Sequence, residues 1–148
     1  MGAIIGLLML LLGSMSLFGF FILPYLFMGL GLSKIAKNEG KGKRFLAWIP
    51  IINIFLLGML VEDDVYEKIR GKFTVIIGVS MFLALFIGKG FITYLPLALS
   101  IYAFFFIANR YSKNVTAHTV IAVITFGLSM PFQLFRFRKR KPLTKIAY

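Results

Sequence analysis

The 148-residue sequence contains no cysteine, and this absence excludes disulfide bonds, thiolate zinc sites and cysteine nucleophiles. Histidine and acidic residues are also scarce, which leaves little material for a metal centre or an acid–base pair. The complete set is His118, Glu39, Glu62, Asp63, Asp64 and Glu67. We therefore expect a protein that is not an enzyme and that holds no metal and no cofactor.

Long apolar runs, in contrast, make up most of the chain. Hydrophobic residues are 59% of the sequence and the mean hydropathy is +0.90, so a soluble fold of this length would leave much apolar surface in water. The first charged side chain is Lys34, and the run before it lacks the basic start of a secretory signal, so we expect a retained first membrane helix. The predicted fold class is an all-α, polytopic membrane bundle.

Charged residues divide the chain into apolar segments of unequal length. A helix needs about 20 residues to cross a hydrocarbon core of about 30 Å, so three of these segments are long enough and two are short. Lys89 stands between two glycines and is predicted to lie at the tip of a helical hairpin. We expect one transmembrane domain over residues 1–135 and a basic tail over residues 136–148. The apolar segments are residues 4–32, 45–61, 73–88, 91–109 and 115–135.

The basic residues indicate the orientation, because short cytoplasmic loops carry an excess of lysine and arginine. One basic cluster follows the first apolar segment and another follows the last. Both are expected in the cytoplasm, which puts the amino terminus outside and the carboxyl terminus inside. The first cluster is Lys34, Lys37, Lys41, Lys43 and Arg44, and the second is Arg136, Arg138, Lys139, Arg140, Lys141 and Lys145.

Two layouts satisfy this orientation. With five full crossings, the basic residues between 68 and 72 and those at 110 and 113 lie outside. If segments 45–61 and 115–135 are instead re-entrant or broken, three crossings remain and Lys89 is the one basic residue outside. The charge rule favours the second layout and leaves the first open.

Each of these two segments contains an interior proline, Pro50 or Pro131. Proline removes a backbone donor and costs about 3 kcal/mol in a helix interior, so each segment is expected to kink or break there. Asn53 and Gln133 lie close by and can hydrogen-bond exposed backbone or a neighbouring helix. They are the candidates for an intramembrane polar site, and ordinary kinks are the alternative interpretation.

Two further patterns indicate local packing. Ser80, Ala84 and Gly88 recur every four residues and would line one helix face, where small residues permit close helix approach in membranes. The acidic run from Glu62 to Asp64 precedes a short polar stretch, and we interpret it as a helix cap with local ion pairs.

The tail alternates aromatic and basic residues, and it is expected to lie on the inner leaflet. Each basic residue near anionic lipid contributes about 1 kcal/mol to membrane attachment. Membrane topology accounts for nearly all of the net charge of +12, so no nucleic-acid partner is expected. The predicted anionic-lipid contacts are Arg136, Arg138, Lys139, Arg140 and Lys141.

Several motifs occur in a fixed order along the chain. Lys34-Ile-Ala-Lys-Asn-Glu-Gly40 precedes Leu46-Ala-Trp-Ile-Pro-Ile-Ile-Asn53, and the acidic run, Ile101-Tyr-Ala-Phe and Pro131-Phe132 follow. In these motifs the chain resembles a family of uncharacterised small bacterial multi-pass membrane proteins, from which it departs in a shorter central region and a strongly basic tail. The resemblance implies a multi-pass protein of the bacterial cytoplasmic membrane and implies no activity.

Two functions are compatible with these patterns. Because polar residues are scarce inside the apolar segments, we expect a non-catalytic accessory, assembly, regulatory or protective subunit. Its partner would be a larger membrane protein, or further copies of the chain. The alternative is a minimal transporter or channel that uses the proline-broken segments around Asn53 and Gln133.

Overall fold

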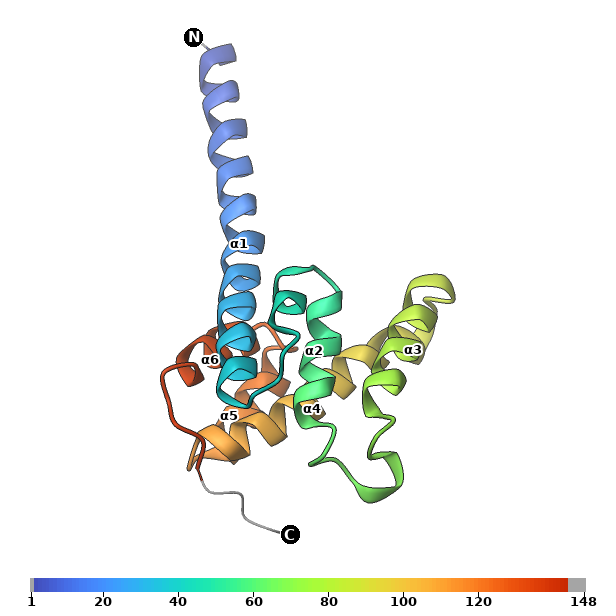
Figure 1. Ribbon diagram of the computed structural model, residues 1–148. Helices are drawn as coiled ribbons and strands as arrows, with labels where there is room; N and C mark the ends of the chain where they lie inside the picture. Colours follow the sequence, from blue (N-terminus) through green and yellow to red (C-terminus); the bar gives the residue numbers. More distant parts are fainter. Residues whose placement is uncertain (1, 144–148) are drawn as a thin grey trace.

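The computed structural model describes residues 2–143, and every regular element in that range is helical, so the all-α prediction is confirmed (Figure 1). The α-helices are α1 (Gly2–Asn38), α2 (Ile52–Val61), α3 (Phe73–Phe86), α4 (Leu95–Tyr111), α5 (Val115–Ile124) and α6 (Met130–Phe137). Short 3-10 helices are η1 (Arg44–Trp48), η2 (Glu67–Ile69) and η3 (Gly90–Tyr94).

Two of the helical segments are long and apolar enough to cross a membrane. They are Gly19–Asn38 in α1 and Gly90–Tyr111, which joins η3 to α4. Helices α2, α3 and α5 are apolar but shorter. By length and composition, the structure therefore supports a membrane location.

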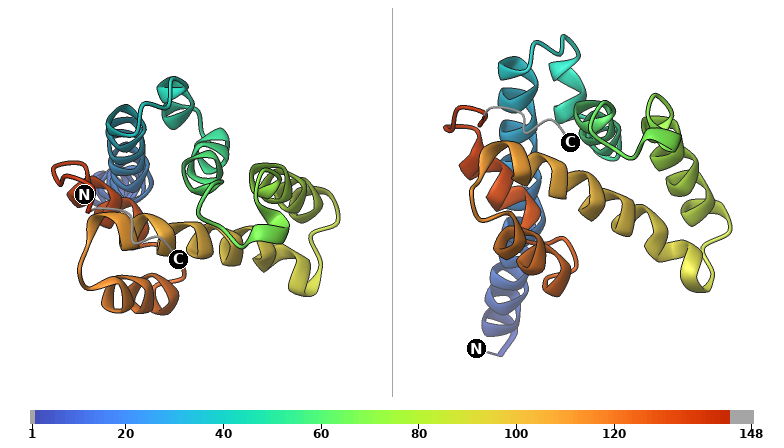
Figure 2. Two further views of the ribbon diagram at one scale, coloured as in Figure 1. Left: turned by 60° about the horizontal axis from the view of Figure 1, so that its bottom comes forward. Right: turned by 90° about the horizontal axis from the view of Figure 1, so that it is seen from below.

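Helix α1 organises the rest of the molecule. Its N-terminal part projects away from the other helices, while its C-terminal part lies between η1 with α2 on one side and α6 on the other (Figures 1 and 2). The Tyr25 hydroxyl donates to the backbone oxygen of Trp48 on the η1 side. On the α6 side, the ring of Phe27 lies 5.2 Å from that of Phe132 and 4.5 Å from that of Phe135.

Both proline-containing segments fold back on themselves. Hairpin 1 (residues 41–63) rises through η1, turns, and returns through α2, and its ends are joined by the Lys41–Asp63 ion pair at 3.6 Å. Hairpin 2 (residues 111–140) rises through α5 and returns through α6. Its ends are joined by a hydrogen bond in which Arg140 Nη1 donates to the backbone oxygen of Tyr111 at 3.1 Å. Each segment therefore begins and ends on the same side of the molecule.

The two turns have unusual backbone conformations. In hairpin 1, Ile51 has a φ of 71°, and the Ile52 amide donates to the Pro50 oxygen at 2.8 Å, which forms a tight three-residue γ-turn. In hairpin 2, Phe126 has a φ of 49° and precedes Gly127 at 79°. Residues other than glycine rarely adopt positive φ, and an isoleucine there is strained. The chain therefore reverses at Ile51 and Phe126 although these residues disfavour the backbone conformation that the turns require.

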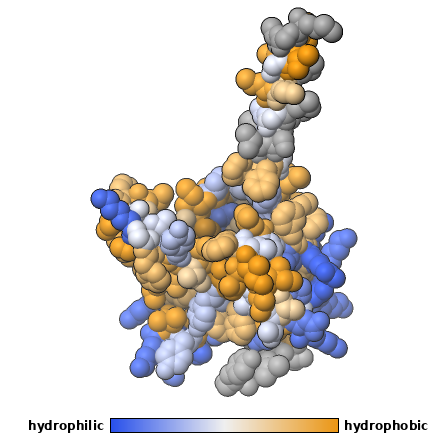
Figure 3. Space-filling view, turned by 180° about the vertical axis from the view of Figure 1, so that it is seen from behind, coloured by the Kyte–Doolittle hydropathy of each residue, from blue (hydrophilic) through white to orange (hydrophobic). Residues whose placement is uncertain are grey.

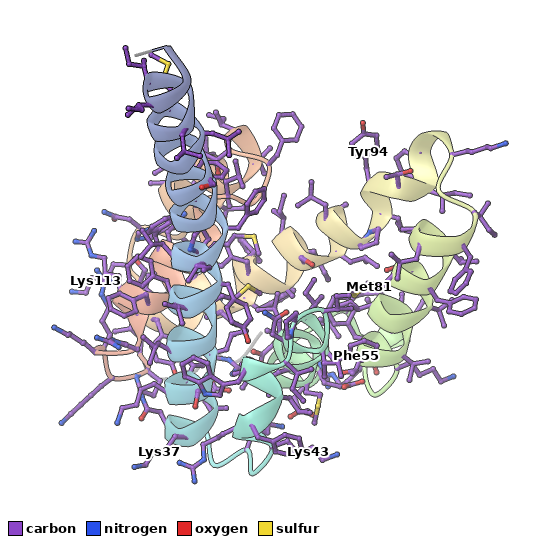
Figure 4. The ribbon with its side chains drawn as sticks, turned by 90° about the horizontal axis from the view of Figure 1, so that it is seen from above. Lys37, Lys43, Phe55, Met81, Tyr94 and Lys113 are labelled. Atoms are coloured by element: carbon purple, nitrogen blue, oxygen red, sulfur yellow. The ribbon has the colours of Figure 1, made fainter. Side chains whose placement is uncertain are left out.

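The ends of both hairpins meet the ends of the longer helices in one charged layer, which we call the base. It comprises residues 34–44, 62–72, 110–114 and 136–141. Thr74, at the start of α3, donates to the Glu62 carboxylate, and the Leu143 amide donates to the Arg110 oxygen at 2.6 Å. Tyr94 directly precedes α4, at the end of that helix that lies away from the base. It lies far from Lys37 and Lys43 of the base (Figure 4).

Close packing depends on glycines that the sequence patterns do not single out. A Cβ at Gly31 of α1 would lie 2.7 Å from the Leu134 carbonyl carbon of α6, and one at Gly78 of α3 would lie 2.5 Å from the Phe55 ring. Such glycines let helices approach closely where lipid supplies no hydrophobic driving force.

The predicted stripe of small residues is shorter than expected. Ser80 is buried and its hydroxyl donates to the Ile77 oxygen at 2.7 Å. Helix α3, however, ends at Phe86, so Gly88 lies in the turn toward α4 with a φ of 30°. A helical face therefore contains Ser80 and Ala84, while Gly88 serves the turn.

We predict that Gly31→Ala destabilises the protein by about 1–3 kcal/mol, because the new methyl group would meet helix backbone that cannot move aside. Gly13→Ala is the matched control in the same helix, since no atom lies within 4 Å of its added methyl. Thermal unfolding in detergent micelles measures both. Equal unfolding temperatures for the two variants would contradict the close α1–α6 approach.

Candidate functional site

A partly buried charge network lies at the centre of the base. Arg110, near the end of α4, donates through Nη1 to Glu39 Oε2 at 2.5 Å and through Nε to Asp64 Oδ2 at 2.6 Å. Nη2 also donates to the Leu60 oxygen at 2.9 Å. The three charged side chains are only 11–20% exposed. One guanidinium therefore joins the end of α1, the end of α2 and the end of α4.

Neighbouring groups complete this network. The Tyr111 hydroxyl donates to Glu39 Oε1 at 3.2 Å, and the Lys41–Asp63 ion pair lies beside it. A cavity of about 460 Å³ adjoins Arg110 and is lined in part by Asn38, Leu60 and Leu143. Because Glu39 and Asp64 are held by Arg110, they are positioned as structural anions.

Hairpin 2 contains a chain of polar side chains. Gln133 Oε1 lies 2.6 Å from His118 Nδ1, and Gln133 Nε2 donates to the Ser129 hydroxyl at 3.0 Å and to the His118 backbone oxygen at 3.3 Å. The Thr125 hydroxyl in turn donates to Ser129 at 2.9 Å. Gln133 thus cross-links α5 and α6, and His118 contributes to the same link.

The two halves of the predicted intramembrane polar site occupy different hairpins. Asn53 is buried in α2 of hairpin 1, and Gln133 lies in α6 of hairpin 2. Within residues 2–143, the side-chain hydrogen bonds of Gln133 go to His118 and Ser129 and not to Asn53. Helix α1 lies between the hairpins (Figure 2). A joint polar site therefore gains no support from the geometry.

A concave basic surface, the basic pocket, lies at the ends of α1 and α6. It has a volume of about 820 Å³. Figure 3 shows hydrophilic residues along the right side and at the lower left of that view, around a largely hydrophobic middle. Residues from α1, η1 and the tail line this pocket: Leu30, Ser33, Lys34, Lys37, Asn38, Arg44, Arg138, Lys139, Arg140, Lys141 and Pro142.

Four of the five predicted lipid-contacting tail residues line this pocket. The fifth, Arg136, is exposed on α6 outside it. Two of the tail arginines are also ordered by aromatic rings: the Arg138 guanidinium lies 3.7 Å from the centre of the Phe135 ring, and that of Arg140 lies 5.4 Å from Phe137. Lys145 lies outside the described residues.

The N-terminal half of α1 is a second candidate site. Several of its described side chains are large, apolar and exposed, as at Leu7, Met9 and Leu10. Gly6, Gly13 and Gly19 have no neighbouring atom within 4 Å of an added Cβ. A helix turns 100° per residue, so Gly6 and Gly13 lie on nearly the same face. This part of α1 therefore offers an exposed apolar surface with Gly6 and Gly13 on one face.

The sequence patterns missed the most connected residue of the base. Arg110 and Glu39 are 71 positions apart, and Arg110 and Asp64 are 46 apart. The sequence places Arg110 only among the basic residues that lie outside in the layout with five crossings, and it places Asp64 in a local cap with Glu62. A lone arginine at the end of an apolar helix, in a chain with so few carboxylates, was the available signal.

No group of three or more histidine, cysteine or acidic side chains within residues 2–143 is arranged to hold a metal ion. No protein-family model matches the chain, and no curated protein or solved structure matches it significantly. The resemblance to small bacterial membrane proteins therefore stays a prediction.

We predict that Arg110→Gln lowers the free energy of unfolding by about 3 kcal/mol, the lower end of the range for a buried ion pair, because it leaves the partly buried Glu39 and Asp64 without a counter-charge. Adding Glu39→Gln and Asp64→Asn to the same variant should restore part of the loss. Lys113→Gln, an exposed change three residues away, should stay within about 0.5 kcal/mol of the parent. Chemical denaturation in micelles measures all three. A loss no larger for Arg110→Gln than for Lys113→Gln would refute the network's role.

Proposed function

We propose that this protein crosses the bacterial cytoplasmic membrane three times, through α1, α4 and the shorter α3, with the base in the cytoplasm. A helix shorter than the hydrocarbon core, as α3 is, is accommodated by local thinning of the bilayer. Hairpins 1 and 2 would enter the bilayer from the cytoplasmic side and return. The supporting observation is that their turns expose large apolar residues, including Ile49, Ile51, Phe126 and Leu128. Turns that face water are usually built from polar residues, so these apolar turns are better suited to lipid. The opposite ends of the two hairpins are charged and suit the cytoplasmic side of the membrane.

The observation that best supports a function is the length of α1. Its uncharged portion before Lys34 is about 50 Å long at 1.5 Å per residue. The hydrocarbon core is about 30 Å thick, so containing this portion would need a tilt of about 50°, beyond the usual 0–40° range. With Lys34 at the cytoplasmic interface, roughly the first twelve residues extend past the core. These residues are apolar and need cover other than lipid.

We infer that this cover is a helix of a larger membrane protein and that the chain is its non-catalytic accessory subunit. Gly6 and Gly13 provide a face on which another helix can approach closely. The transporter alternative is less well supported, because Gln133 is engaged within hairpin 2 and Asn53 lies in the other hairpin.

The experiment is affinity purification from gently solubilised membranes, followed by cross-linking and mass spectrometry. We expect a stoichiometric larger membrane protein to co-purify, with cross-links to residues 4–13. Gly6→Leu combined with Gly13→Leu should reduce its recovery about tenfold or more, because the leucines would keep a neighbouring helix at a distance.

The matched control is Ile4→Phe, which adds bulk on the opposite face of the same exposed stretch. It should leave recovery unchanged. Unchanged monomer folding in both variants is checked by circular dichroism. Recovery of the monomer alone, or of a second copy of the chain alone, would argue against an accessory subunit of a larger protein.

A further inference from the structure

We propose that the basic pocket is a headgroup site for an anionic phospholipid that carries more than one phosphate group, such as a diphosphatidylglycerol. This goes beyond a diffuse attraction of the tail to the inner leaflet. It assigns the ligand to one concave site built by α1, η1 and the tail together, and it adds Lys34, Lys37 and Arg44 to the tail residues.

The first argument is charge. Seven basic side chains line the basic pocket, and its lining contains no carboxylate. The ion pairs of the described chain use Lys41 and Arg110, so none of the seven basic residues is neutralised within residues 2–143. Four of the five acidic residues of the chain are engaged elsewhere, by Arg110, Lys41 and Thr74. Such a concentration of positive charge attracts several negative charges at once.

The second argument is how the site is built. Leu30, Ser33, Lys34, Lys37 and Asn38 are spaced three and four residues apart, so they form a single face of α1. Beside these cations, Ser33 and Asn38 provide neutral hydrogen-bond donors, which phosphate oxygens can also accept from. Arg138 and Arg140 approach from the tail, and their guanidinium groups rest on Phe135 and Phe137. The cations are thus presented from two directions.

The third argument is position and size. The basic pocket lies at the cytoplasmic end of α1 in the proposed topology, and Leu30 lies one turn toward the bilayer from Lys34. A headgroup bound there could leave its acyl chains along the apolar surface of α1. A volume of about 820 Å³ falls within the range of about 300–1,000 Å³ for small-molecule sites. It has room for more than one phosphodiester, and basic pockets beside membrane helices suit headgroups of this kind.

The test titrates lipids into the purified full-length protein in a neutral detergent, with bound lipid counted by native mass spectrometry. Three probes are compared: a diphosphatidylglycerol with two phosphates, phosphatidylglycerol with one at equal total charge, and inorganic pyrophosphate. We expect retention of the two-phosphate lipid about tenfold or more above the one-phosphate lipid, and little displacement by pyrophosphate. Equal retention of both lipids, or full displacement by millimolar pyrophosphate, would overturn the assignment.

Two triple variants with the same loss of charge provide the second readout. Lys34→Gln, Lys37→Gln and Arg44→Gln remove cations from the basic pocket, whereas Lys43→Gln, Lys113→Gln and Arg136→Gln remove exposed cations outside it. Lys37, Lys43 and Lys113 are labelled in Figure 4. We expect the first set to weaken binding of the two-phosphate lipid about tenfold or more and the second less than about twofold. Equal weakening would show non-specific charge attraction and refute a built site. The comparison of lipids on the parent protein remains decisive if a triple variant does not fold.

Discussion

The pairing of Arg110 with Glu39 and Asp64 is the interaction on which the arrangement of the helices depends. A guanidinium and two carboxylates that are largely removed from water are tolerable only when they meet in good geometry. Their hydrogen bonds fix the ends of α1, α2 and α4 at one level. Since α1 and α2 both end there, the chain between them must rise and return, which is why residues 41–63 form a hairpin.

The bilayer supplies the complementary constraint. Trp48, near the top of hairpin 1, packs against Gly29, so the hairpin rises roughly 10–15 Å above the end of α1. In the proposed topology this height is about half of a hydrocarbon core. A turn at that depth has few polar partners, and the γ-turn at Ile51 satisfies one carbonyl at the cost of a strained φ. In hairpin 2, side chains satisfy backbone groups instead: the Ser129 amide donates to the Thr125 hydroxyl at 3.2 Å, and Gln133 Nε2 donates to the His118 backbone oxygen at 3.3 Å. The two hairpins, on opposite sides of α1, thus satisfy the backbone polar groups of their turns in different ways.

Sequence patterns predicted the helical class and placed breaks in the two proline-containing segments, because hydrophobic periods and proline act locally. Pro50 does lie between η1 and α2, and Pro131 lies in the first turn of α6, where its missing donor costs little. The same patterns failed for Arg110 and Gly31, whose roles depend on partners far along the chain. They also assigned Asp63 and Asp64 to local pairs, whereas both bind distant cations. The sequence predicted lipid contacts for the tail residues of the basic pocket, but it did not predict that residues of α1 form the facing wall.

We propose that both hairpins return to one cytoplasmic base, and labelling of single cysteines tests this topology most directly because the chain has no native cysteine. Exposed positions suit the reagent: Tyr66→Cys and Lys113→Cys in the base, and Phe91→Cys beside the α3–α4 turn. We expect membrane-impermeant maleimide to label residues 66 and 113 only from the cytoplasmic side and residue 91 only from outside. Labelling of 66 and 113 from outside, with 91 inside, would establish five crossings and contradict it.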